Sequence, residues 1–165
     1  MLNRIIILII AMTSLNINAE TVLELGEYPP NYLGRDVNGN DVTLEDNKGK
    51  IVVISFWASW CSPCLKELPI LEGIQNKVGD DKVKVVAINF KENSKQYRHI
   101  KNKLSSLKLT LTHDKRGAIG KKFGVKGIPN LFIVGKDGKL LFHKIGYGAS
   151  SINKIVKVLN EELTS

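Results

Sequence analysis

Residues 51–64 read IVVISFWASWCSPC, and this stretch decides the fold. Its first seven residues, Ile51–Trp57, form a nearly continuous apolar run rich in β-branched side chains, which is typical of a strand buried on both faces of a sheet. Pro63 then indicates the start of a helix. Proline lacks a backbone N–H, and in the first turn of a helix this N–H would have no partner in any case. The only two cysteines of the chain, Cys61 and Cys64, therefore stand where a buried strand passes into a helix.

Outward from this stretch, hydrophobic periodicity predicts alternating helices and strands. Apolar side chains recur at helical spacing between Pro63 and Val78, and Gly79 ends the pattern. The other predicted elements are a buried strand over 83–90, a helix over 94–107, a strand over 109–112, a short helix over 116–123, a hairpin over 131–145 and a closing helix over 152–163.

The segment before the central strand carries a hairpin signal. Asn38-Gly39 lies between two short runs, 33–37 and 41–44, and this dipeptide favours a tight turn between antiparallel strands. The sequence therefore predicts an α/β fold with a central mixed sheet flanked by helices, preceded by an N-terminal β-hairpin extension.

Composition limits the classes of protein that the chain can represent. It has 165 residues, 43% hydrophobic and 24% charged, which fits one globular domain. Two cysteines exclude a zinc site with four sulfur ligands and a secreted mini-protein with many bridges. The formal net charge is +8. We interpret the lysines as dispersed along solvated faces, a mild aid to meeting acidic surfaces, and expect no nucleic-acid partner.

Residues 1–19, MLNRIIILIIAMTSLNINA, resemble a secretory signal rather than a structural segment. Arg4 supplies a positive charge, Ile5–Met12 an apolar run, and Ala19 a small residue at a cleavage site. The alternative is an uncleaved anchor, although the run is short for the roughly 20 residues that span a bilayer. We expect one domain over 20–165, with a net charge of +7, in the periplasm or anchored outside the cytoplasm.

The spacing of the two cysteines indicates redox chemistry. Cys61 and Cys64 are three residues apart on one helical face and can close a small disulfide ring. At a helix N-terminus the backbone N–H groups and the helix dipole should lower the pKa of Cys61, which makes Cys61 the nucleophile. Cys64 lies one turn further and suits the resolving role. Ser62 and Pro63 lie between them.

Two less reactive interpretations of the cysteines remain open at this point. A structural disulfide would close too short a loop to add much stability. Half a zinc site shared by a dimer would need further ligands, and His99, His113 and His143 are scattered. A redox-active dithiol is the interpretation that the spacing favours.

Together, several motifs resemble the thioredoxin superfamily. They are residues 53–64 (VISFWASWCSPC), Glu67, Pro69 and residues 124–129 (GVKGIP). Within the superfamily the chain is similar to the extracytoplasmic TlpA/ResA-like branch, which includes the cytochrome c biogenesis thioredoxins. The resemblance covers about residues 28–163. It implies a thioredoxin fold and a thiol:disulfide oxidoreductase that uses its own dithiol, without a cofactor or metal.

The resemblance also implies roles for four residues. Pro129 matches a proline that the family holds in the cis form beside the disulfide, and Ile128 would present its backbone to an extended substrate. Trp60 would pack beside the active site and shield it. Glu67 matches an acidic residue of ResA-like proteins and would relay a proton for the resolving thiol. A surface glutamate paired with a lysine is the alternative for Glu67.

The chain departs from family patterns at three places. Ser55 stands where thioredoxins proper carry a buried aspartate, which moves any proton relay elsewhere. Asn130 follows Pro129, where the cytochrome c biogenesis subgroup often has glutamate. The pair Ser62-Pro63 replaces the Gly-Pro of thioredoxin, and this pair tunes the redox potential in the family.

The resemblance favours a reductase that receives electrons from a membrane donor and reduces disulfides of partner proteins, with cytochrome c maturation as the favoured pathway. A dithiol oxidase or isomerase is the alternative enzyme, and the segment 90–109 is short for an inserted substrate-binding domain. A Cu(I) metallochaperone is the alternative from another class, although copper-delivery members space their cysteines by three residues. We expect a monomer.

Overall fold

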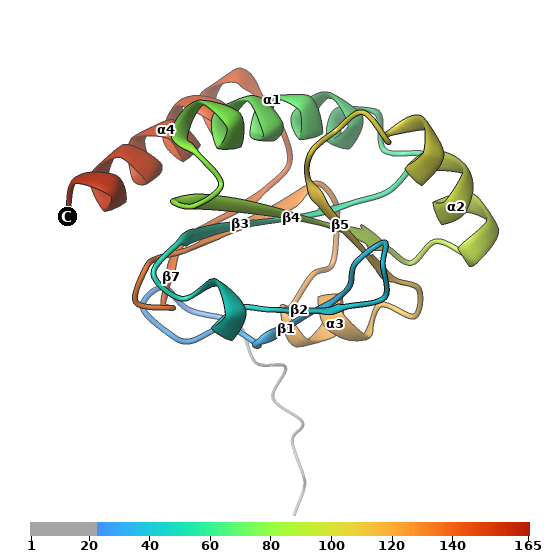
Figure 1. Ribbon diagram of the computed structural model, residues 1–165, viewed down its shortest axis with the longest axis horizontal. Helices are drawn as coiled ribbons and strands as arrows, with labels where there is room; N and C mark the ends of the chain where they lie inside the picture. Colours follow the sequence, from blue (N-terminus) through green and yellow to red (C-terminus); the bar gives the residue numbers. More distant parts are fainter. Residues whose placement is uncertain (1–22) are drawn as a thin grey trace, which may run out of the picture.

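The structure, a computed structural model, describes residues 23–165, so the predicted signal segment lies outside the described residues. Strands and helices alternate along the chain (Figure 1). The elements are β1 (Tyr32–Arg35), β2 (Asp41–Thr43), the 3-10 helix η1 (Glu45–Asn47), β3 (Ile51–Trp57), α1 (Ser62–Val78), β4 (Val83–Phe90), α2 (Ser94–Lys103), β5 (Thr110–Asp114), α3 (Ala118–Lys122), β6 (Asn130–Val134), β7 (Leu140–Ile145) and α4 (Ala149–Thr164).

A five-stranded mixed sheet organises the domain, with the strand order β5-β4-β3-β6-β7. β3, β4 and β5 run parallel, whereas β6 and β7 are antiparallel to their neighbours. All seven residues of β3 are buried, as the apolar run 51–57 predicts for the central strand. Because parallel strands end at one edge of a sheet, the segments after β3, β4 and β5 meet there.

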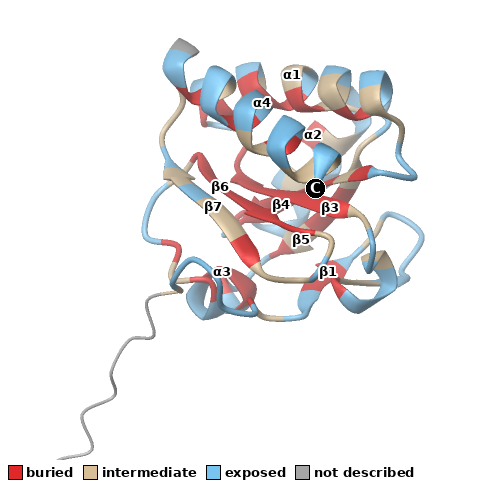
Figure 2. Cartoon of the chain, turned by 90° about the vertical axis from the view of Figure 1, so that its left-hand side faces the viewer, coloured by how far each residue is buried: buried red, intermediate tan, exposed pale blue. Residues whose placement is uncertain are grey.

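The sheet separates two layers (Figure 1). Helices α1, α2 and α4 cover one face, and the β1–β2 hairpin, η1 and α3 cover the other. Each face has its own apolar core: α1 and α4 pack on β3, β4 and β6 through one cluster, whereas Leu33 and Phe123 join a cluster beneath the opposite face. Figure 2 shows the buried residues concentrated in the strands between the two layers.

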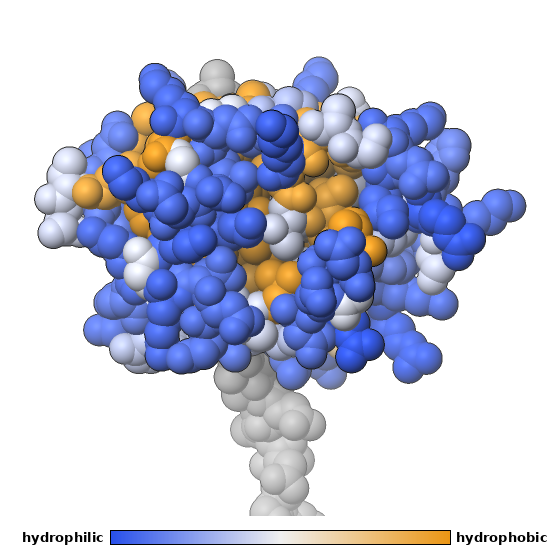
Figure 3. All heavy atoms as spheres, in the orientation of Figure 1, coloured by the Kyte–Doolittle hydropathy of each residue, from blue (hydrophilic) through white to orange (hydrophobic). Residues whose placement is uncertain are grey.

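The surface is mainly hydrophilic on the face shown in Figure 3. Hydrophobic residues gather there in a band at the level of the central sheet, between the helical layer and the opposite layer. No helix in the range 23–165 is both long and apolar enough to cross a membrane.

The architecture confirms the predicted mixed sheet with its flanking helices and N-terminal hairpin. The predicted boundary that differs most from the structure is the end of the second helix. The helix expected over 94–107 ends at Lys103, and Leu104 is its C-cap. Ser105 and Ser106 follow, and serine favours turns because its hydroxyl competes for backbone hydrogen bonds. Leu107 packs against the core from this turn, so its apolar character does not require a helix.

Candidate active site

The two cysteines lie at the N-terminus of α1 and form a disulfide, with Cα atoms 5.2 Å apart. Cys61 is the N-cap, and its Sγ accepts the backbone N–H of Cys64 at 3.3 Å. Cys61 is 5% exposed, whereas Cys64 is fully buried. Of the two cysteines, only Cys61 is therefore accessible in part to a partner, and its role as the nucleophile stays a prediction.

A tight turn presents Cys61 at the end of β3. The backbone N–H of Cys61 donates to the carbonyl of Ala58 at 3.1 Å, which reverses the chain directly after the buried strand. Ser62 then starts the helix, and Pro63 follows within the first turn, where a missing N–H costs no hydrogen bond. Local sequence thus fixes both the turn and the helix start.

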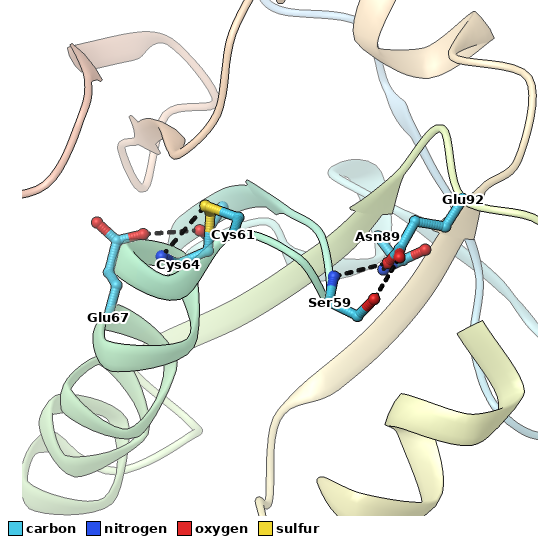
Figure 4. The surroundings of a disulfide bond; sticks show 7 residues. Ser59, Cys61, Cys64, Glu67, Asn89 and Glu92 are labelled. Carbon is cyan, nitrogen blue, oxygen red and sulfur yellow. Dashed lines mark hydrogen bonds between the residues drawn. A yellow bond between two sulfur atoms is a disulfide. The ribbon is translucent and has the colours of Figure 1, made fainter. Parts of the chain in front are cut away.

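Glu67 is buried, and this rules out the alternative of a surface glutamate paired with a lysine. Its side chain is on α1, one turn after Cys64, and only 1% of the residue is exposed. The hydroxyl of Ser55, in the middle of β3, donates to Oε2 of Glu67 at 2.9 Å. In Figure 4 the carboxyl group of Glu67 extends towards the disulfide end of α1.

Burial changes the acidity of this carboxyl group. Removal from water disfavours the charged form and raises the pKa of Glu67 from 4.5 to about 7, while the hydrogen bond from Ser55 opposes the shift. A carboxyl group with a pKa near neutrality can both accept and donate a proton at physiological pH. The Ser55 hydroxyl and the Glu67 carboxyl group meet between β3 and the facing helix α1.

A second buried carboxylate, Glu92, lies on another side of the disulfide (Figure 4) and was missed by the sequence reasoning. Its Oε2 accepts the backbone N–H of Ser59 at 2.7 Å and the Nδ2–H of Asn89 at 2.6 Å. Its Oε1 accepts the hydroxyl of Ser59. Glu92 is 2% exposed. The two donors of Ser59 therefore tie the turn before Cys61 to the segment after β4, and Asn89 of β4 binds the same carboxylate.

The backbone at Glu92 is held as well. Nε2 of His113, on β5, donates to the carbonyl of Glu92 at 2.8 Å. The ring of His113 stacks on Tyr97 of α2, with centroids 4.3 Å apart. The only sequence signal for this cluster is that Ser59, Glu92 and His113 follow or end β3, β4 and β5, the strands that finish at one edge of the sheet.

Trp60 does not pack as expected. Trp60 is 70% exposed and directly precedes Cys61 at the tip of the turn. The reason is the turn itself, which fixes both flanking residues and directs Trp60 towards solvent. An exposed tryptophan next to a nucleophile is a surface that a partner can cover.

Ile128 and Pro129 lie against the same site. The Ile128–Pro129 peptide bond is cis. Ile128 is half-buried and packs against the cluster that contains both cysteines. The carbonyl of Pro129 accepts the N–H of Gly146 at 2.8 Å, whereas no hydrogen bond to another residue of the range 23–165 engages the backbone of Ile128.

Two histidines outside the disulfide have hydrogen-bond partners of their own. Within residues 23–165, no three side chains of His, Cys, Asp or Glu come together as a set of ligands. His143 bonds to Asn130, and His113 bonds to Glu92, so these rings have structural partners.

The fold and the site together define a class: a thioredoxin-like domain with a disulfide at the start of the helix that follows its central strand. Comparison with known protein families supports this class. The Redoxin family model matches residues 25–159, and the chain belongs to this family.

Relatives of the chain have names that describe thiol-disulfide chemistry. The chain is 34% identical over 122 residues to the thiol-disulfide oxidoreductase ResA of Bacillus thuringiensis subsp. konkukian, which covers 74% of this chain and 70% of that protein. It is 30% identical over 120 residues to the sporulation thiol-disulfide oxidoreductase A of Bacillus subtilis, with 72% of each chain covered.

Solved structures extend the comparison. A protein from Chlorobium tepidum assigned as the thiol:disulfide interchange protein DsbE is 27% identical, with a TM-score of 0.79, and the match covers 86% of this chain and 99% of that one. StoA from Bacillus subtilis is 28% identical, with a TM-score of 0.63, over 79% and 96%. The chain is therefore a thiol-disulfide oxidoreductase of the ResA type, which works through its own cysteines.

Proposed function

We propose that this oxidoreductase acts outside the cytoplasm as a reductase of protein disulfides, with Cys61 as the nucleophile, Cys64 as the resolving thiol and Glu67 as the proton relay. The observation that carries the proposal is the pairing of a nearly buried Cys61–Cys64 disulfide with the buried carboxyl group of Glu67 on the same helix. Cytochrome c maturation is the pathway we propose, on the strength of the family resemblance.

The reaction begins with the dithiol reduced. The Cys61 thiolate attacks one sulfur of the partner disulfide, which forms a mixed disulfide and releases the other partner sulfur as a thiolate that takes a proton from solvent. The helix N-terminus and the N–H of Cys64 favour the attacking thiolate.

Resolution then requires a second deprotonation. The Cys64 thiol transfers its proton to the Glu67 carboxylate and attacks the Sγ of Cys61. The Cys61–Cys64 disulfide forms, and the second partner sulfur leaves as a thiolate and takes up the proton. The partner disulfide gains two electrons, the dithiol loses two, and a membrane electron donor would restore the dithiol.

Substrate contact involves the surface around Cys61. The exposed ring of Trp60 offers apolar area. The unengaged backbone of Ile128 offers a donor and an acceptor to an extended partner segment, in the manner of an added strand. Ser62 and Pro63, between the cysteines, would set the redox potential. We propose that the enzyme acts as a monomer.

The redox potential tests the direction of the reaction. Equilibration of the purified domain with glutathione buffers, followed by quantification of the dithiol, should give a potential well below that of strong oxidants. A value of about −120 mV, typical of a strong dithiol oxidant, would contradict the reductase and favour the oxidase alternative.

Location needs a separate experiment, because the predicted signal lies outside the described residues. The full chain should be recovered from the periplasmic or membrane fraction of a bacterial host, with its N-terminus at Glu20 if the signal is cleaved. Recovery in the cytoplasmic fraction would contradict the proposed location.

A further inference from the structure

We propose that a basic cleft beside the active site binds an acidic segment of the protein whose disulfide is reduced. This inference deepens the proposed function and rests on it. The cleft has a volume of about 470 Å³. Its lining within residues 23–165 includes four exposed cations, Lys91, Arg116, Lys121 and Lys126, and no Asp or Glu from that range. We call it the basic cleft.

The basic cleft corrects the expectation that the positive charges are dispersed. Residues 115–126, KRGAIGKKFGVK, already hold five Lys or Arg and no acid. The fold adds Lys91, which follows β4 and comes from a segment more than twenty residues earlier in the chain. Spacing along the sequence does not reveal this convergence, because it depends on β4 and β5 ending at one edge of the sheet.

Lys91 is held in place within the basic cleft. Its backbone has a positive φ of 56°, a conformation that costs a lysine some strain, and its N–H donates to the carbonyl of Asp114 at 3.0 Å. Its side chain crosses Gly117 so closely that a Cβ there would lie 2.4 Å from Cε of Lys91. Its Nζ lies 5.0 Å from the ring centroid of Phe90. A cation fixed in this way loses little conformational entropy on binding.

Two acidic groups of the range 23–165 that lie close to the basic cleft, Asp114 and Glu92, are buried and engaged in hydrogen bonds. Asp114 is 4% exposed, and its Oδ2 accepts the N–H of Gly120 at 2.8 Å. Glu92 is bound by Ser59 and Asn89. Neither carboxylate is presented to solvent.

Two segments of the chain connect the basic cleft to the active site. Lys126 is three residues before Pro129, at most about 11 Å along a fully extended chain, and Ile128 packs against the cluster of Cys61 and Cys64. Lys91 precedes Glu92, whose carboxylate binds the turn before Cys61. A partner held by Cys61 through its cysteine can therefore place residues a few positions away in the basic cleft.

Two disulfide-bonded peptides of equal length test the proposal. One has Glu, the other Gln, at the positions two to four residues from the reacting cysteine. Mixing each with the pre-reduced protein should give a rate constant about ten times higher for the Glu peptide at an ionic strength of about 10 mM. The ratio should approach one at about 300 mM, where screening is strong.

A matched pair of double variants locates the effect. Arg116→Gln with Lys121→Gln should reduce the Glu-to-Gln rate ratio to about one. The control, Lys154→Gln with Lys157→Gln, removes the same charge from α4, on the opposite face of the sheet (Figure 1), and should preserve the ratio.

Three results would overturn the inference. The first is equal rates for the Glu and Gln peptides at low ionic strength. The second is an equal loss of the Glu-to-Gln rate ratio in both double variants. The third is binding to vesicles that the Arg116 and Lys121 substitutions abolish while the Glu-to-Gln rate ratio persists. The last result, with vesicles of anionic phospholipid, would assign the basic cleft to a membrane surface. Failure to reduce the Gln peptide at all would instead contradict the proposed reductase, so the two failures are distinguishable.

Discussion

Two buried carboxyl groups flank the disulfide, and they differ in the number of hydrogen bonds that they accept. Glu67 accepts one, from Ser55, and burial raises its pKa to about 7. Glu92 accepts three, two of them from Ser59 on the turn before Cys61. Burial disfavours the charged form of Glu67. The three hydrogen bonds of Glu92 link the turn before Cys61 to β4 and the segment after it.

The difference separates two tasks within one active site. Glu67 can exchange a proton without breaking a network, because only one hydrogen bond depends on its charge. Glu92 holds two segments together and would release both if it were lost. A buried acid can thus serve as a proton carrier or as a structural link, depending on the hydrogen-bond donors around it. Variants of the site separate these two tasks.

The largest effect concerns the dithiol that both carboxyl groups serve. Cys61→Ala should abolish disulfide reduction, because the nucleophile is lost. Cys64→Ala should still attack and should accumulate mixed disulfides, visible by non-reducing electrophoresis and identifiable by mass spectrometry. Accumulation with the Cys61 variant instead would reverse the two roles.

Loss of the proton relay should be the next largest effect. Glu67→Gln should slow the resolving step about 100-fold at neutral pH, because Cys64 loses its base. The measurement is release of the second partner thiol in a single turnover across pH 5 to 9, where the variant should lack the inflection near the pKa of about 7.

Ser55→Ala is the matched control for this pH profile. The hydrogen bond from Ser55 lowers the pKa of Glu67, so its removal should move the inflection to higher pH while the relay is retained. An unchanged profile in both variants would show that Glu67 is not the relay.

Glu92→Ala should act on stability. Its removal leaves the buried donors of Ser59 and Asn89 without an acceptor, which should lower the free energy of unfolding of the oxidised protein by about 3 kcal/mol in urea titrations. Ser59→Ala removes one of the three hydrogen bonds and should cost about 1 kcal/mol. Equal costs would mean that Glu92 does not link the two segments.

The last expected effect has the opposite sign, a gain in stability, and is smaller than that of Glu92→Ala. The native pKa of Glu67, about 7, exceeds its ordinary value of 4.5, so the native state binds more protons than the unfolded chain between these values. Stability therefore falls as the pH rises through this window. Glu67→Gln should raise the free energy of unfolding by about 1 to 2 kcal/mol near pH 8 and change it little near pH 4. Destabilisation at both values would contradict the neutral form of Glu67.

Much of the site could be predicted because it is local. The run Ile51–Trp57, the turn, Pro63 and the two cysteines follow one another directly, and hydrophobic periodicity with helix-capping rules determines their structure. The exposure of Trp60 could not be predicted in this way, since an aromatic residue at a strand end packs in one turn geometry and faces solvent in another.

The remaining features depend on residues far apart in the chain. Ser55 and Glu67 meet across the interface between β3 and α1, and Ser59 meets Glu92 33 residues later. Each partner is an ordinary polar residue within its own segment, so no local pattern marks it.

By itself, the sequence determined the class of fold and the cysteine pair at the start of the helix, because strand burial, helix start and cysteine spacing are short-range properties. Only the tertiary structure decided that Glu67 is buried, that Glu92 binds the turn before Cys61 and that four cations line one cleft. The physical reason is that burial, pKa and charge convergence depend on which strand ends and helix faces pack together, and packing is a property of the whole domain.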